Sequence, residues 1–331
     1  MLKYLIILLD DTSVSFCHHN NMKTERFPMP LKMLKEGIKF GMKENMRIQF
    51  VLPCYPLPKN YWETMMSIDH SIIAPGNIDY NGLVPQNTLY QMPDVLIFED
   101  VNAFADHAKE KNLSYVLKID KNTLYEQIDK ISACIQEITR LNIILNDIDR
   151  FTNDDIDKYK ECLNILSNGV KRSYFEGNTP QVNIVTDRIM LKEMNNCNAG
   201  VSSVTLAPDG KFYICPAFYQ AVSSTPIRTN FDIGSLYDGI NIKNSNLLKL
   251  ESAPLCRKCD AYQCKRCIWL NNKTTYEMNT PSHEQCVVAH LERNASCIIL
   301  KQLRKGAPSF MEGIIINDID YLDPFEVKQE K

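Results

Sequence analysis

The sequence predicts an α/β protein with a mainly parallel sheet, followed by a small cysteine-rich part. Two observations support this fold class. Through the first 190 residues, short apolar runs of strand length alternate with stretches in which apolar residues recur at helical spacing, as in repeated βαβ units. Eight of the 12 cysteines lie after residue 190. We therefore expect two domains, residues 1–190 and residues 191–331, the second ending in a helix.

The elements of the first domain follow from apolar pattern and capping residues. Strands are predicted at residues 4–9, 47–52, 71–74, 94–98, 115–119, 142–145 and 182–185. Helices are predicted to begin at Pro30, Thr123 and Asn153, each followed by an apolar stripe. Proline suits a first helical turn, Thr123 and Glu126 form a capping box, and asparagine is a preferred N-cap. Strands separated by helices indicate parallel pairing in an open or closed barrel.

Composition excludes several function classes. A net charge of −3 without a long Lys/Arg run gives no electrostatic footprint for nucleic acid or an anionic membrane. The apolar run Tyr4 to Leu9 is far shorter than the roughly 20 residues of a membrane span, and it lacks signal-peptide flanks. Neither GxGxxG nor GxxxxGK[ST] occurs. We expect a cytoplasmic protein, where clustered cysteines indicate metal or redox chemistry.

Seven late cysteines form a candidate metal-binding set. Cys197 and Cys215 flank a predicted hairpin that turns at residues 208–210, and Cys286 lies near the start of a helix that Ser282 and Gln285 cap as a box. Between them, two CxxC pairs stand four residues apart, which completes the set Cys197, Cys215, Cys256, Cys259, Cys264, Cys267 and Cys286. A CxxC pair chelates because the turn between its cysteines aims both sulfurs at one ion.

The identity of the metal stays open between two possibilities. Zinc would take the four thiolates of the two CxxC pairs in one tetrahedral site, which leaves three cysteines of the set unexplained. Iron–sulfur clusters take several thiolates each, so the set can supply one or two clusters of the [4Fe–4S] type. We favour iron–sulfur clusters, with zinc as the alternative.

The cysteine spacing resembles the SPASM domain of radical S-adenosylmethionine enzymes that mature peptides. The resemblance rests on Cys197–x12–Gly210–x4–Cys215, on the two CxxC pairs and Cys286, and on the stretches Phe231-Asp-Ile-Gly-Ser-Leu236 and Ala253-Pro-Leu-Cys256. It implies auxiliary iron–sulfur clusters and, ahead of them, a radical-enzyme-like partial (β/α) barrel. The implied ligands are Cys197, Cys215 and Cys267 for one cluster, and Cys256, Cys259, Cys264 and Cys286 for the other.

The front of the chain departs from the radical-enzyme pattern. That family binds its catalytic cluster through CxxxCxxC after the first strand, whereas here only Cys17 is present, with Asn21 and Thr24 in the other two positions. Binding and cleavage of S-adenosylmethionine are therefore not expected. The whole chain is similar to the CXXX repeat peptide maturase family, through Leu9-Asp-Asp-Thr-Ser-Val-Ser-Phe-Cys-His18, Met42-Lys-Glu-Asn-Met46 and the cysteine-rich end.

This resemblance implies a maturation component for a ribosomally synthesised Cys-repeat peptide, acting beside a true radical enzyme. The alternative is a non-catalytic binding or scaffold protein stabilised by zinc. Candidate catalytic residues are Cys17, His18 and His19, which follow the first strand; they also fit a polar loop whose imidazoles bond locally. His290 shares a helix face with Cys286, where packing is favoured over a ligand role.

Overall fold

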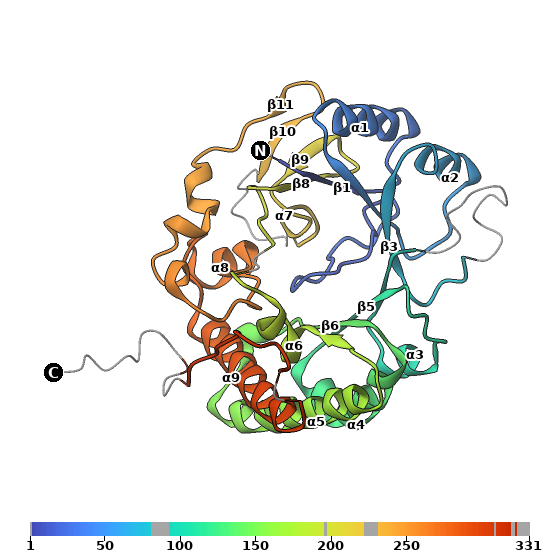
Figure 1. Ribbon diagram of the computed structural model, residues 1–331. Coiled ribbons are helices and arrows are strands. Elements are labelled where there is room, and N and C mark those ends of the chain that lie inside the picture. The colour runs from blue at the N-terminus through green and yellow to red at the C-terminus, as the bar shows by residue number, and fades with distance from the viewer. Residues whose placement is uncertain are drawn as a thin grey trace. The chain divides into compact units, whose positions relative to one another are not determined.

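The structure is a computed structural model that describes residues 2–80, 93–194, 197–221, 231–307, 309–318 and 322. Its residues group into two compact units, each made of two segments of chain (Figure 1). The first unit combines residues 1–98 with residues 198–249, and the second combines residues 99–197 with residues 250–331. The expected division into residues 1–190 and 191–331 stays a prediction.

The first unit contains a mixed sheet in the strand order β11-β10-β9-β8-β1-β2-β3-β4. Strands β8, β1, β2, β3 and β4 pair in parallel, and β9, β10 and β11 continue the sheet by antiparallel pairs. The strands are β1 (Tyr4–Leu8), β2 (Arg47–Val51), β3 (His70–Pro75), β4 (Val95–Phe98), β8 (Ser203–Leu206), β9 (Lys211–Tyr213), β10 (Asp232–Ser235) and β11 (Gly239–Ile240).

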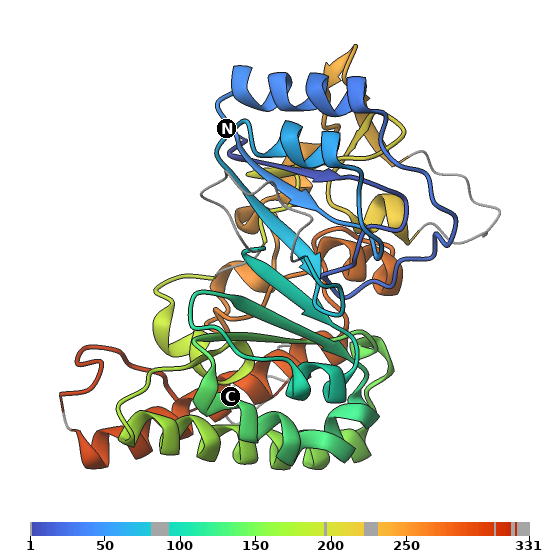
Figure 2. The ribbon, with the colours of Figure 1, turned by 90° about the vertical axis from the view of Figure 1, so that its right-hand side faces the viewer.

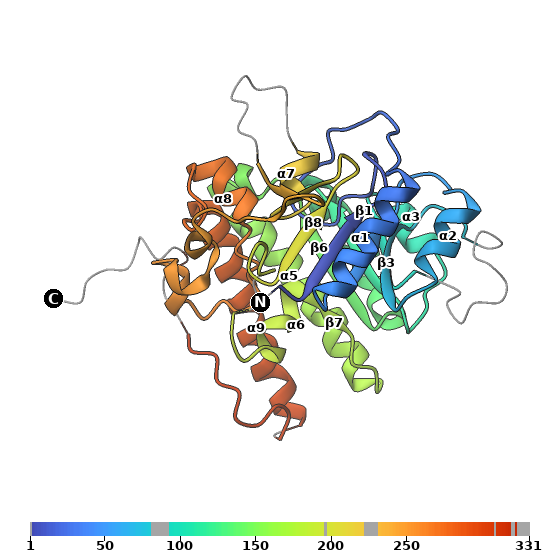
Figure 3. The same cartoon turned by 90° about the horizontal axis from the view of Figure 1, so that it is seen from above.

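Helix α1 (Leu31–Lys43) lies along this sheet (Figure 3). Its close approach depends on two glycines. A Cβ on Gly37 would stand 2.4 Å from Leu206 Cδ2, and one on Gly41 would stand 2.9 Å from Ile48 Cδ1. The unit also contains α2 (Lys59–Met65) and the short helix α7 (Ala217–Gln220). The predicted hairpin is confirmed, since β8 and β9 pair antiparallel around the turn at residues 208–210.

The second unit contains three parallel strands in the order β5-β6-β7. They are β5 (Ser114–Ile119), β6 (Arg140–Leu145) and β7 (Gln181–Val182). Long helix α5 packs against both α4 and α9, and α9 also packs against α6 (Figure 2). The helices are α3 (Val101–Asp106), α4 (Lys121–Ala133), α5 (Asn153–Phe175), α6 (Asn183–Met190), α8 (Ile268–Thr275) and α9 (His283–Gly306).

Three local predictions are wrong for identifiable reasons. The N-cap of α5 is Thr152 instead of Asn153, because Thr152 forms a capping box with Asp155. The strand expected at residues 182–185 ends at Val182 and continues as α6. The Asn183 side chain bonds the backbone of Ile143 through both its oxygen and its nitrogen, which fixes the helix start beside β6. Helix α4 begins two residues before Thr123, because the Asp120 carboxylate accepts the Thr123 N–H at 2.8 Å and is the actual N-cap.

The predicted α/β class with mainly parallel pairing is confirmed. In the described part of the chain, no helix is both long and apolar enough to cross a bilayer. The capping box of Ser282 and Gln285 is present at the start of α9, so the helix carrying Cys286 begins where the sequence predicts.

Candidate functional site

The loop after β1, residues 9–23, here called the β1 loop, is built around a buried carboxylate. Asp10 is fully buried, and its Oδ1 accepts the backbone N–H of Thr12 at 2.7 Å and the Thr12 hydroxyl at 2.5 Å. Its Oδ2 accepts the Tyr55 hydroxyl at 2.7 Å. Burial, then the hydrogen bond to Asp10, raises the pKa of Tyr55 well above its usual range, so this hydroxyl is a permanent donor.

Helix α7 holds the β1 loop from a segment about 200 residues later in the chain. Gln220 is fully buried; its Nε2 donates to the Ser13 carbonyl at 2.6 Å, and its Oε1 lies 2.8 Å from His19 Nε2. The Tyr219 hydroxyl donates to Asp11 Oδ1. A backbone carbonyl, an imidazole and a carboxylate of the loop are thus satisfied by two adjacent side chains.

Asn21 completes this network inside the loop. Its Nδ2 donates to the carbonyls of Asp11 at 2.7 Å and Ser13 at 3.0 Å, while its Oδ1 accepts the Lys23 N–H at 3.0 Å. This is the position where the radical-enzyme pattern has a cysteine. The side-chain amide therefore fixes the backbone here by hydrogen bonds.

The candidate catalytic residues occupy different environments within the β1 loop. His19 is fully buried, whereas Cys17 and His18 are half-buried. The Ser15 hydroxyl donates to the His19 carbonyl at 2.6 Å, and the His19 ring lies against Gln220. These contacts give His19 a structural role, and the catalytic assignment of all three residues stays a prediction.

The cysteine block, residues 256–267, opens with a short 3₁₀ turn over Cys256–Lys258. Cys256 is buried with Met194 and Ala253, and Cys259 packs against the same cluster. The backbone N–H of Ala261 points at the Cys259 sulfur at 3.4 Å. The two thiols of the first CxxC pair therefore share one apolar surrounding.

Burial keeps the thiols of the cysteine block protonated. It raises the pKa of Cys256 to about 11 and those of Cys264 and Cys267 to about 12. The Cys264 N–H donates to the Ala261 carbonyl at 3.0 Å, and the Cys197 N–H donates to the Lys265 carbonyl at 3.4 Å. Cys197 therefore lies beside the second CxxC pair.

An ion pair between a partly exposed carboxylate and a buried guanidinium fixes the cysteine block to α9. The Asp260 carboxylate accepts two bonds of 2.6 Å from the Arg293 guanidinium, and the Arg293 side chain is only 1% exposed. Arg188 from α6 lies 3.6 Å from the same carboxylate. Burial alone would raise the pKa of Asp260, but the two arginines outweigh it and lower that pKa.

His290 of α9 contacts the cysteine block directly. Its Nε2 lies 3.5 Å from the Cys259 sulfur, and its Nδ1 bonds the Leu322 carbonyl. The sequence raised a ligand role for this residue only as the less favoured possibility. The structure shows instead that its ring is one of the thiol's immediate neighbours.

The remaining predicted ligands lie on separate elements. Cys215 precedes α7 in the first unit, and Cys286 is in the first turn of α9 in the second. Within the described residues, no group of three or more His, Cys, Asp or Glu side chains stands close enough to hold a metal ion. The chemistry of the donors fits iron–sulfur or zinc binding, because both favour soft thiolate ligands. The seven-cysteine ligand set stays a prediction.

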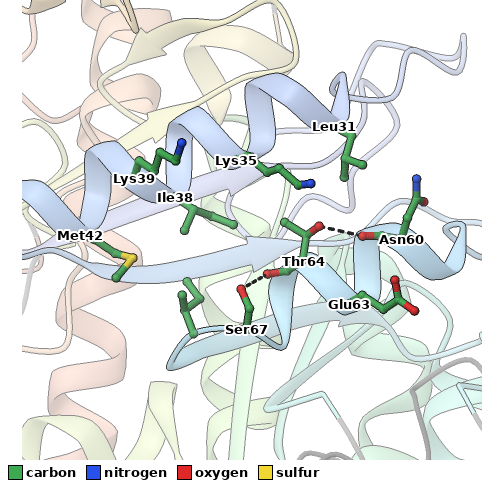
Figure 4. A pocket seen from close by; sticks show the side chains of 10 residues that line it. Leu31, Lys35, Ile38, Lys39, Met42, Asn60, Glu63, Thr64 and Ser67 are labelled. Atoms are coloured by element: carbon green, nitrogen blue, oxygen red, sulfur yellow. Dashed lines mark hydrogen bonds between the residues drawn. The ribbon is translucent and has the colours of Figure 1, made fainter.

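A groove of about 480 Å³ lies between α1 and α2 (Figure 4). Aliphatic side chains and the polar side chains of both helices face it, and neither cysteine nor histidine is among them. Its lining is Leu31, Lys35, Ile38, Lys39, Met42, Asn60, Glu63, Thr64, Ser67 and Ile68. The groove therefore adds no thiol or imidazole to the predicted ligands.

Sequence reasoning missed the residues that position these groups. Gln220, Asp260 and Arg293 carry the polar contacts of the two regions. An isolated glutamine or ion pair has no local pattern, because its partner lies far away in the sequence. The feature of the sequence that pointed to such contacts was the high density of charged residues within the cysteine block.

Comparisons with known proteins show a shared fold. No protein-family model matches the chain, and no curated protein matches it. Among solved structures it is similar to anSMEcpe, a radical S-adenosylmethionine maturase. Native anSMEcpe with bound AdoMet is 12% identical in sequence to this chain. The two structures match with a TM-score of 0.58, over 92% of this chain and 99% of that one.

The same maturase has also been solved with peptides. With AdoMet and the Kp18Cys peptide it gives 13% identity and a TM-score of 0.59 over 92% of this chain and 99% of that chain. With the Cp18Cys peptide the TM-score is 0.60 at the same identity and coverage. At these identities the similarity concerns architecture. The comparison therefore shows that this chain shares the overall fold of anSMEcpe.

Proposed function

We propose that the protein is a maturation component for a ribosomally synthesised, Cys-repeat peptide, of the CXXX repeat peptide maturase type. The observation that carries this proposal is the fold shared along 92% of the chain with a maturase that holds Cys-containing peptides in its solved complexes. In this proposal the protein binds the precursor peptide and carries auxiliary iron–sulfur clusters, while a companion radical enzyme starts the chemistry.

The thiols of the cysteine block support cluster binding. Cys256 and Cys259 pack against one apolar cluster, and the Cys197 N–H bonds the Lys265 carbonyl inside the block. Their raised pKa values mean that metal binding must displace thiol protons. The ligands would be Cys197, Cys215 and Cys267 for one cluster, and Cys256, Cys259, Cys264 and Cys286 for the other. Clusters held in this way supply electron-transfer or substrate-binding iron.

The β1 loop does not fit a catalytic cluster. A three-cysteine site needs thiolates where this loop has Asn21 and Thr24. The Asn21 amide is engaged by two backbone carbonyls, those of Asp11 and Ser13, so hydrogen bonds determine the loop's shape. We therefore infer no cleavage of S-adenosylmethionine by this chain, and no radical step is assigned to its residues.

Metal analysis and peptide binding test the proposal together. The full chain is purified anaerobically, its iron and acid-labile sulfide are measured, and it is titrated with a synthetic peptide of Cys-x-x-x repeats. We expect iron with matching sulfide and saturable binding of the peptide. A peptide with serine in place of cysteine is the matched control and should bind more weakly.

Two outcomes would contradict the proposal. A colourless protein that contains zinc and binds neither peptide supports the scaffold alternative. Reductive cleavage of S-adenosylmethionine by the purified chain, measured beside an active radical enzyme, would show that the β1 loop does support radical chemistry.

A further inference from the structure

The groove between α1 and α2 is an open surface feature of the first unit. Its volume is about 480 Å³, and six of its ten lining residues are exposed. A small-molecule site buries most of the surface of its ligand, which a groove with exposed walls does not do. The lining side chains instead follow both helices along their length (Figure 4), so the groove suits a stretch of polypeptide lying between them.

The α1 side of the groove carries an apolar strip. Leu31, Ile38 and Met42 line it at spacings of seven and four residues, which places all three on one face of the helix. Ile38 is buried, whereas Met42 is 60% exposed. From Leu31 to Met42 the strip runs for about three turns, or roughly 16 Å of helix axis. It therefore offers apolar contacts to a partner helix of similar length.

The charge of α1 is opposite in sign to that of the whole chain. The helix contains four lysines and one glutamate, whereas the chain has a net charge of −3. Lys35 and Lys39 are exposed and line the groove one turn apart, and within the described residues neither lies in an ion pair. On α2, Glu63 already lies 3.4 Å from Lys59. The groove thus keeps two cationic groups without a partner among these residues.

The α2 side of the groove is polar. Asn60, Thr64 and Ser67 line it on successive turns. The Thr64 hydroxyl donates to the Asn60 carbonyl at 2.8 Å, and the Ser67 hydroxyl donates to the Thr64 carbonyl at 2.7 Å (Figure 4). Both hydroxyl protons are therefore used inside the protein, while the hydroxyl oxygens can still accept hydrogen bonds. This side suits the polar face of a partner.

We propose that the groove is a docking site for an acidic amphipathic helix of a partner polypeptide. Apolar side chains on one face of that helix pack against Leu31, Ile38 and Met42, which is the helix-in-groove mode of recognition. Carboxylates beside this face pair with Lys35 and Lys39. An anionic lipid surface matches the charge but is flat, whereas the groove is concave. The inference goes beyond the proposed function, because it involves neither a metal nor a Cys-repeat peptide.

The first test uses two synthetic peptides and the full chain. One is an amphipathic helix of about 15 residues, long enough to be helical in part, with leucines on one face and glutamates beside them. The matched control has lysine in place of every glutamate. We expect saturable binding of the acidic helix that weakens as salt is added, and roughly tenfold or weaker binding of the lysine helix. Equal binding of both peptides, or binding of neither, would overturn the inference.

Charge reversal inside and outside the groove gives the second test. The double variant Lys35→Glu, Lys39→Glu should lose roughly tenfold in affinity for the acidic helix and bind the lysine helix more tightly than the wild type does. A protein that merely unfolds gains no such affinity. The control, Lys32→Glu with Lys43→Glu, makes the same change of net charge at exposed positions of α1 outside the groove. Equal losses in both double variants would contradict docking in the groove.

An apolar variant and a vesicle assay complete the test. Met42→Gln should weaken binding of the acidic helix about fivefold, whereas Met22→Gln, with a similarly exposed side chain, should leave it unchanged. Hydrogen exchange should slow in α1 and α2 when the peptide is bound, and slowing confined to other elements would overturn the site. Binding to phosphatidylserine vesicles, without binding to the acidic helix, would overturn the polypeptide as the occupant.

Discussion

The β1 loop and the cysteine block both hold candidate site residues of the sequence analysis, yet the two regions are stabilised in different ways. In the β1 loop, the polar groups of Asp10, Asn21 and Gln220 have oxygen and nitrogen partners at hydrogen-bond distance. In the cysteine block, thiols with raised pKa values lie together beside an imidazole.

This difference shows two ways in which a chain can hold polar side chains in place. The Asn21 amide supplies directed hydrogen bonds, so the backbone of the β1 loop is specified without an ion. Clustered thiols make weak hydrogen bonds, so they gain little from one another in the absence of a soft metal. We therefore expect variants of the β1 loop to change stability, and variants of the cysteine block thiols to change metal content.

The largest effect is expected from removing the anchor of the cysteine block. Asp260→Ala leaves the buried guanidinium of Arg293 without its carboxylate, and we expect a loss of about 3 kcal/mol in the free energy of unfolding. Urea unfolding measures it. Asp318→Ala removes the exposed pair with Lys301, which solvent screens, so it should change the free energy of unfolding far less. Equal effects would show that the pair of Asp260 and Arg293 does not hold the block.

A smaller effect is expected in the β1 loop. Gln220→Ala removes a buried amide that serves the Ser13 carbonyl and the His19 ring, which should cost about 2 kcal/mol of unfolding free energy. Gln302→Ala, a part-exposed amide bonded to Lys171, is the control. If the Gln220→Ala protein is as stable as the wild type, α7 does not support the β1 loop.

Variants of Asn21 and Cys264 should show the clearest contrast between the two regions in stability and iron content. Asn21→Ala deletes the bonds to two backbone carbonyls, so we expect a loss of about 1 kcal/mol with unchanged iron content. Cys264→Ser should lower the iron bound per chain. Both quantities are measured on the same preparations by urea unfolding and iron analysis. Iron loss in Asn21→Ala would show that the loop does take part in metal binding.

The last prediction concerns a carboxylate outside both regions and a change that is confined to acid pH. Burial alone would raise the pKa of Asp155, but hydrogen bonds from Lys121 and Thr152 lower it to about 2. Because the folded-state pKa lies below the unfolded value, this contribution to stability is full above about pH 4. It is lost as pH falls through about 2. The stability difference between wild type and Asp155→Asn should shrink over that range, and a constant difference would contradict it.

Local sequence patterns predicted the elements but not the contacts that position the site. The Ser282 capping box was predicted because its residues are three apart in the chain. The N-cap of α4 is Asp120, and α6 begins at Asn183. Both depend on which of several polar side chains accepts a hydrogen bond from a backbone N–H. The pairing of Gln220 with His19, and of His290 with Cys259, joins distant segments. Such pairs produce no periodic pattern in the sequence from which they could be predicted.

The short helix α7 also sets an order of events during synthesis on the ribosome. The β1 loop emerges before α7, and the side chains that secure it, Tyr219 and Gln220, are added only after some two hundred further residues. At roughly 5–20 residues per second, the nascent loop waits on the order of ten seconds or more for its partners. Its thiol and two histidines are therefore accessible to the cell's metals and oxidants in the unfinished chain before the loop is closed.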